Sequence, residues 1–162
     1  MSAKAPTYDI LYDFESQIEE AFSDVLDEKT AIGCYTQRSN QDLTTPRYEF
    51  QFTNGAATGK HGRAKDGFLY PDGWSGTLRA RLITERKADV SFTAHRQSVA
   101  KLRRYIAQFE TFITEENLPY LDIESVMETG SSQGIDEDQK HDITELSFLV
   151  GFYIRPNAWP DV

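Results

Sequence analysis

This sequence has little cysteine and no long apolar run, and both shortages limit what the protein can be. Cys34 is the single cysteine among 162 residues, so no internal disulfide can form. The apolar neighbours of Cys34 indicate a buried, unreactive thiol. No apolar run reaches the roughly 18 residues that a membrane-spanning helix needs, and the opening residues lack the apolar core of a signal peptide. We therefore expect a soluble protein of a reducing compartment that does not contact membranes.

Basic residues are also scarce. Lys and Arg number 17 against 26 Asp and Glu, which leaves a formal net charge of -9 at pH 7. Contacts with nucleic-acid phosphates and with anionic lipid come from Lys and Arg. The charge balance therefore argues against a general nucleic-acid binder and against a lipid-docking protein.

The motifs of the common catalytic and metal sites are missing as well. His61, His95 and His141 are isolated from one another, and the sequence has neither HExxH nor a cysteine pair. The glycines of 55–67 precede a strand rather than a helix, so they lack the helical amides of a phosphate cradle. No GxSxG nucleophile motif occurs. We expect no enzymatic activity and no cofactor or metal, and we interpret His95 as a solvated residue in the first turn of a helix.

The apolar residues that are present follow two periodicities. Spacings of three and four predict a helix at about 8–28, capped by Thr7, and a second that Thr93 caps and Asn117 ends. Alternation predicts five strands, which lie at 31–38, from Pro46 onward, at 76–85, at 120–129 and at 143–155. The order α-β-β-β-α-β-β predicts an α+β fold. In it, a two-layer, mainly antiparallel five-stranded sheet carries two helices on one face.

The same periodicities indicate a single domain over residues 1–162. Its longest irregular segment is 54–76, a loop or hairpin between the second and third strands. This segment is basic and aromatic, which leaves two interpretations open: a mobile solvated hairpin, or a contact with an acidic partner surface. The residues of the candidate contact are Lys60, Arg63, Lys65, Phe68, Tyr70 and Trp74.

Charge is distributed unevenly between the two predicted helices. The first has a uniformly acidic outer face. The second is basic early and acidic late, which opposes the helix dipole. Either the two helices pair with each other, or the acidic helix of one copy meets the basic helix of the next, a head-to-tail contact that closes into a ring. The residues of that subunit contact are Glu15, Glu19, Asp24, Arg96, Lys101, Arg103 and Arg104.

The link between the last two strands is rich in Gly, Ser and acid. Lys140 breaks the alternation of acids that an EF-hand loop requires, so a solvated acidic loop is favoured over a calcium site. Its acids are Asp136, Glu137, Asp138 and Asp142.

The element order resembles that of the tail terminator and tail-completion (neck) proteins of long-tailed bacteriophages. The closing part of the chain carries most of the resemblance, with a strand, an acidic Gly-containing turn and a long apolar strand after a helix. The residues that match are Tyr12-Asp13-Phe14, Leu118-Pro119-Tyr120, Gly130, Asp136, Asp138, Glu145 to Ile154, and Arg155-Pro156-Asn157-Ala158-Trp159. The 54–76 segment is an elaboration that smaller members of the family lack.

The resemblance implies a structural subunit of the virion, assembled in the host cytoplasm. Such subunits form a hexameric ring that caps the tail tube, ends its polymerisation and meets the head-side connector or stopper protein. DNA would pass through the ring without tight binding, because a wall formed by Asp136, Glu137, Asp138 and Asp142 repels phosphate. A different function also fits the residues: a small intracellular peptide- or protein-binding regulatory domain that uses a sheet edge or the aromatic loop.

Overall fold

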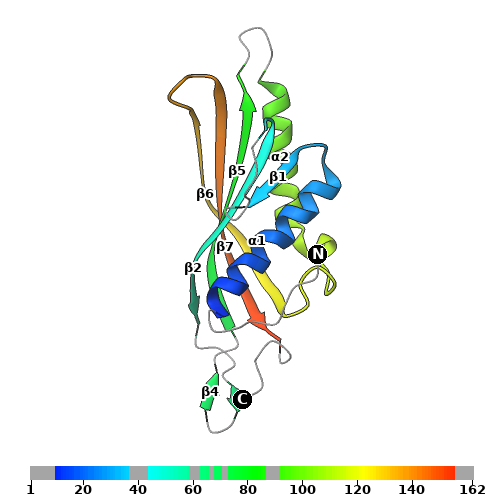
Figure 1. Cartoon of the computed structure of the whole chain (residues 1–162), viewed down its shortest axis with the longest axis vertical. Helices are drawn as coiled ribbons and strands as arrows, with labels where there is room; N and C mark the ends of the chain where they lie inside the picture. The colour runs from blue at the N-terminus through cyan, green and yellow to red at the C-terminus, as the bar shows by residue number, and fades with distance from the viewer. Residues whose placement is uncertain are drawn as a thin grey trace.

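The computed structural model describes the backbone of residues 10–36, 44–58, 63–65, 68–70, 73–86 and 92–155, with their side chains except at 10–13, 63–65 and 68–70. The elements are α1 (Ile10–Lys29), β1 (Gly33–Thr36), β2 (Arg47–Ala57), β3 (Arg63–Lys65), β4 (Phe68–Tyr70), β5 (Gly73–Glu85), α2 (Thr93–Ala107), α3 (Phe109–Phe112), β6 (Leu121–Ile135) and β7 (His141–Ile154). The expected α+β class is confirmed: a five-stranded sheet carries the helices on one side (Figure 1).

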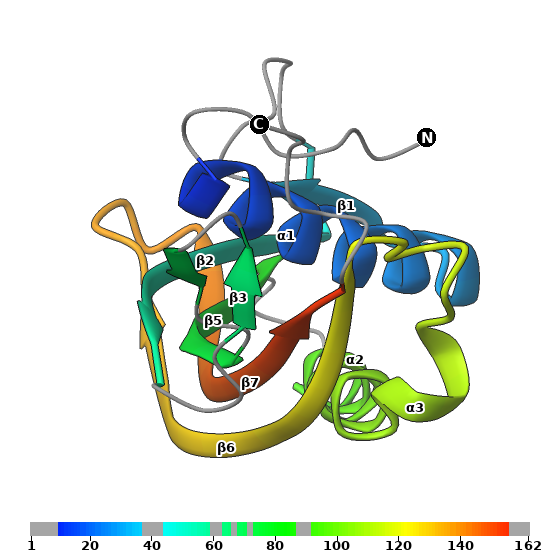
Figure 2. The same cartoon turned by 90° about the horizontal axis from the view of Figure 1, so that it is seen from below.

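The sheet has the strand order β1-β2-β5-β7-β6 and is mixed rather than purely antiparallel. β1 pairs with β2 in parallel, whereas the other neighbouring strands are antiparallel. β5, β6 and β7 are long and twist together along the length of the molecule (Figure 1). Seen from below, α1 and α2 lie over different parts of the sheet (Figure 2), and the two helices contact each other through the core. β6 and β1 form the two edges of the sheet.

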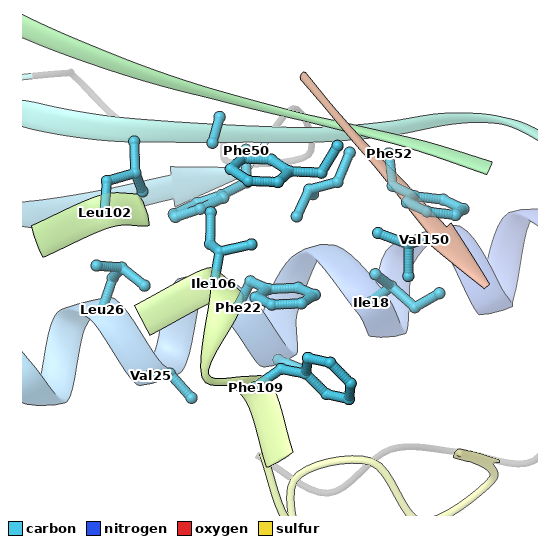
Figure 3. Close-up of a cluster of buried hydrophobic side chains, with 14 of the residues drawn as sticks. Ile18, Phe22, Val25, Leu26, Phe50, Phe52, Leu102, Ile106, Phe109 and Val150 are labelled. Atoms are coloured by element: carbon cyan, nitrogen blue, oxygen red, sulfur yellow. The ribbon is translucent and has the colours of Figure 1, made fainter. Parts of the chain in front are cut away.

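The core lies between the sheet and the helices, where the two periodicities of the sequence meet. Every second residue in the first half of β2 is buried, and Phe50 and Phe52 from that strand pack against the apolar stripe of α1 (Figure 3). Phe22 of α1 and Ile106 of α2 lie at the centre of the cluster and are 0% exposed. Burying a side chain of this size contributes about 1.5–3 kcal/mol each. The opposite face of the sheet has no helix on it among the described residues.

The second helix differs from its sequence prediction at both ends. Thr93 is the first helical residue, and Phe92 occupies the cap position without a side-chain cap hydrogen bond. α2 ends at Ala107, and the short helix α3 and a turn follow it. The apolar period continues through Phe109, which is why the sequence predicts one longer helix. Asn117 instead orders the turn after α3, where its Oδ1 accepts hydrogen bonds from Thr114.

This earlier end overturns the expected opposition between the charges of α2 and its dipole. Glu110 lies in the first turn of α3, and Glu115 and Glu116 lie in the turn beyond it. Arg104 lies in the last turn of α2, where a cation is favourable. Arg96 remains unfavourably placed with respect to the helix dipole, because it lies near the N-terminus of α2.

The strand β6 continues well past its predicted end at residue 129 and reaches Ile135. The segment Gly130–Ile135 pairs with β7 without a register shift, although its glycines and serines suggest a loop. The turn that follows is built around Asp136, whose Oδ1 accepts hydrogen bonds from the amides of Lys140 and His141. The acidic link is therefore a tight turn at the tip of a long hairpin.

The 54–76 segment, which the sequence predicts as a loop or hairpin, contains a small hairpin. β3 and β4 pair antiparallel in a sheet of their own at one end of the molecule (Figure 1). Trp74 does not belong to this hairpin: it lies in β5, half-buried, and packs against the core. No helix in the described ranges is long and apolar enough to cross a membrane.

Candidate assembly surface

The face of the sheet opposite the helices carries a ladder of alternating charges. Arg47 Nε lies 2.6 Å from Glu49 Oε2 on β2. Arg81 of β5 lies between two carboxylates, 3.6 Å from Glu49 Oε1 and 3.4 Å from Glu145 Oε2 on β7. Each of these side chains is partly exposed, so the pairs contribute little to stability individually. The two arginines and the two glutamates offset each other, so this part of the surface is near neutral despite the acidic chain.

Beside this ladder, two apolar side chains point into solvent. Met127 of β6 is 58% exposed and Leu149 of β7 is 41% exposed, and the two are direct cross-strand partners. Ile135, near the tip of the hairpin, is 47% exposed. Exposed apolar residues on a sheet without a covering layer are typical of surfaces that contact another protein.

The outer edge of β6 is the most accessible backbone of the sheet. β6 has β7 on one side and no strand on the other within the part of the chain that the structure describes. Edge strands usually carry charges, proline or bulges that prevent pairing with another chain. The first part of β6 carries acids and two register shifts, between Ile123 and Ser125 and between Glu128 and Gly130. The segment Gly130–Ile135 has none of these devices.

The acids predicted to line a DNA passage all lie at the hairpin between β6 and β7 but differ in exposure and partners. Both carboxylate oxygens of Asp136 are engaged within the turn, since Oδ2 lies 2.6 Å from Nδ1 of His141. The hydrogen bond with His141, together with two backbone amides, lowers the pKa of Asp136. Asp142 is half-buried and acts on the nearby His95. Glu137 and Asp138 are exposed at the hairpin tip.

The acidic residues predicted for the subunit contact are distributed differently from what the sequence suggested. Placing Glu19 on the exposed acidic face was wrong: it is 0% exposed, and its Oε2 accepts a hydrogen bond of 2.9 Å from the amide of Phe52. β1 ends opposite Phe50, so the Phe52 amide lies beyond its reach and the carboxylate takes its place. Glu15 is half-buried, and Asp24 is exposed.

The basic residues predicted for that contact are all exposed on α2, as expected for Arg96, Lys101, Arg103 and Arg104. Arg103 forms an ion pair with Glu128 of β6 at 2.8 Å, so this guanidinium contacts the sheet within its own chain. Arg104 lies over the ring of Tyr105, with its Nε 3.4 Å from the side chain of Gln108.

The predicted contact loop is described in part. Arg63 and Lys65 lie in β3, and Phe68 and Tyr70 lie in β4. Lys60 falls outside the described residues. The pairing of β3 with β4 places Arg63 opposite Tyr70 and Lys65 opposite Phe68. Trp74 is not part of this hairpin, because it lies in β5.

His95 is buried, which corrects its interpretation as a solvated residue. Its Nδ1 lies 2.7 Å from Thr84 Oγ1 and its Nε2 lies 2.7 Å from Thr144 Oγ1, and the ring stacks on Phe92. The imidazole thus fastens the start of α2 to β5 and β7. Burial lowers the pKa of His95, and the charge of Asp142 acts in the opposite direction.

Two features bear on possible chemistry. The Cys34 thiol is half-buried, and burial together with Asp27 and Asp24 raises its pKa to about 12, so it stays protonated. Among the described residues, no three His, Cys, Asp or Glu side chains are grouped so as to hold a metal ion.

Two clefts lie on the described surface. One, of about 240 Å³, lies between α3 and the start of β6, with Glu110, Asp122 and Arg155 at its rim. The other, of about 140 Å³, lies on the helix-free side of the sheet over Gly151. Pockets for small organic ligands usually measure roughly 300–1,000 Å³. Both clefts fall below that size.

Neither a protein-family model nor a curated protein matches the sequence. Among solved structures, one whose name describes no function shares 12% identity at a TM-score of 0.49, with 91% of this chain and 96% of that chain covered. The function is therefore argued from the fold and the surface.

Proposed function

We propose that this protein is a structural subunit of a bacteriophage neck or tail ring, which caps the tail tube, ends its polymerisation and joins the tail to the head connector. One observation carries the proposal: the helices cover one face of the sheet, while the other face displays Met127 and Leu149, and Ile135 is exposed near the tip of the β6 edge, in a row that faces the helices. Such a surface is suited to packing against other subunits rather than to enclosing a substrate.

Two further observations support this assignment. The fold class is the one expected from the resemblance to tail terminators, with a long hairpin formed by the last two strands. The tip of that hairpin presents Glu137 and Asp138 to solvent. Carboxylates repel phosphate, so a ring with these tips near its channel would let DNA pass without binding it. Tight binding of duplex DNA by the purified protein at moderate salt would contradict this part of the proposal.

The partners that follow are other copies of the chain in a ring, most simply a hexamer, the tail tube protein on one side and the head connector on the other. The location is the neck or tail of the virion. Light scattering tests this by measuring the absolute molar mass of the protein, alone and with the tail tube protein. We expect a defined multiple of the 18.5 kDa chain in at least one condition. A monomer that ignores tail components and binds one cellular protein would favour a peptide-binding regulatory domain.

A further inference from the structure

The register of the sheet places parts of its two edge strands in the same rows. Cys34 of β1 is paired with Tyr48, Tyr48 with Leu82, Leu82 with Thr144, and Thr144 with Gln133 of β6. One continuous row of the sheet therefore begins at Cys34 and ends at Gln133. The neighbouring rows repeat this relation, so that the whole of β1 lies level with 131–134 of β6.

The directions of the edge strands also match. β1 runs parallel to β2, and each following pair in the sheet is antiparallel, so β6 runs opposite to β1. In a ring, one rotation relates every copy to the next. A rotation that also takes up the twist between the two edge strands brings β6 of one copy beside β1 of the next, antiparallel and in the same rows.

The backbone of β6 has hydrogen-bonding groups directed toward such a neighbour. The amide of Asp136 donates to the carbonyl of His141 on β7 at 3.1 Å. In an antiparallel pair, hydrogen-bonded and non-bonded residues alternate, so Gly134 and Ser132 also direct their amides toward β7. The amides of Ile135, Gln133 and Ser131 then point out of the sheet.

Neither edge segment carries a charge. β1 reads Gly-Cys-Tyr-Thr, and the facing part of β6 reads Ser-Ser-Gln-Gly. Pairing them opposes no like charges, which would be destabilising across strands. A second copy of this chain is therefore a fitting occupant, since one edge complements the other in length, direction and charge.

Building on the proposed ring, we infer that the copies are joined by strand pairing: residues 131–134 of β6 in one copy add antiparallel to β1 of the next, with Gln133 opposite Cys34. The five-stranded sheets then continue from copy to copy around the ring. A contact of this kind is head-to-tail, so it leaves no edge uncovered once the ring closes.

The single native cysteine provides a direct test. Residues of one row point to the same face, and facing Cα atoms in an antiparallel pair lie about 4.5–5.5 Å apart, within disulfide range. In Gln133→Cys, prolonged oxidation of the assembled protein at alkaline pH, where more of the protonated Cys34 thiol ionises, should link each copy to its neighbours, giving chains longer than a dimer on a non-reducing gel. Ser132→Cys is the matched control, because its side chain points to the opposite face and should give no links. Adding Cys34→Ser to Gln133→Cys should abolish the links.

The outcomes separate this inference from the function on which it rests. Rings seen by light scattering, but without cross-links in Gln133→Cys, would overturn the strand pairing and leave the ring subunit in place. Cross-linked dimers that persist when Cys34→Ser is added would overturn it in favour of two β6 strands meeting about a two-fold axis. A wild-type chain that stays monomeric with and without tail tube protein would overturn both proposals.

Discussion

The two edges of the sheet are finished in different ways. On the β2 side, β1 forms the edge only as far as Phe50; beyond it the carboxylate of Glu19 on α1 accepts a hydrogen bond from the amide of Phe52. On the β6 side, the amides of Ser131, Gln133 and Ile135 point away from the sheet, and no described element covers them. The fold therefore ends in two different edge strands, the short β1 and the long β6, which is the asymmetry that a head-to-tail assembly requires.

Removing the carboxylate of Glu19 should break the covered edge. In Glu19→Ala the Phe52 amide stays buried and loses its acceptor, so we expect the free energy of unfolding to fall by about 2–3 kcal/mol. Urea denaturation followed by circular dichroism measures this. Glu19→Gln is the control, because the amide oxygen can still accept the hydrogen bond and should recover much of the loss. Stability of Glu19→Ala within about 0.5 kcal/mol of wild type would show that the carboxylate does not complete the edge.

A matched pair of glycines sharpens the comparison. A Cβ at Gly76 of β5 would clash with the ring of Phe52, whereas a Cβ at Gly134 of β6 meets no atom within 4 Å. Gly76→Ala should therefore destabilise the protein by about 1–3 kcal/mol. Gly134→Ala should be neutral or stabilising by a few tenths of a kcal/mol, since alanine restricts the unfolded chain more than glycine does. Thermal unfolding of both variants checks this. Equal losses would mean that another element packs over the face of β6 at Gly134.

The pH dependence of stability should report on His95, which is hydrogen-bonded to Thr84 of β5 and Thr144 of β7. The pKa of His95 is lowered from 6.5 by burial, so the folded state resists protonation. The stabilisation is complete above about pH 6.5 and is lost as the pH falls below it, because the unfolded chain then binds more protons. Denaturation at several pH values should show this slope in the wild type and a weaker one in His95→Gln, which keeps hydrogen-bonding groups but does not titrate in this range. An unchanged slope in the variant would assign it to other groups.

The smallest effect is expected at the exposed pair of Arg103 and Glu128. Both side chains are more than a third exposed. Arg103→Gln should therefore change the free energy of unfolding by less than about 1 kcal/mol. If the helical charges hold the ring together, this variant should nonetheless weaken assembly. If strand pairing holds it, sedimentation should show assembly close to that of the wild type.

Much of the fold follows from the sequence, because burial on one side of an element imposes a period on it. The alternation in β2 and β7 and the apolar stripe of α1 give the elements, their order and the two-layer arrangement. The end of α2 does not follow, because Phe109 continues the same period after the helix has ended. The extent of β6 does not follow either, since Gly130–Ile135 has a composition typical of loops and is held by its pairing with β7.

The candidate surface is less predictable than the fold for a related reason. Glu19 looks like the other acids of its helix, and only the tertiary position of Phe52 makes it a buried acceptor. The burial of His95 likewise depends on two threonines from distant strands. The level position of Cys34 and Gln133 depends on four separate strand registers. Periodicity along one element contains no information on how that element aligns with another.

The central claim is that the bare edge of β6 is completed by another copy of the chain. Backbone hydrogen exchange, followed residue by residue in the free and the assembled protein, tests it most directly. The amides of Ser132 and Gly134 point toward β7 and should be protected in both states. The amides of Ser131 and Gln133 should exchange quickly in the free chain and slowly in the ring. Fast exchange of these two amides in the assembled ring would contradict the account.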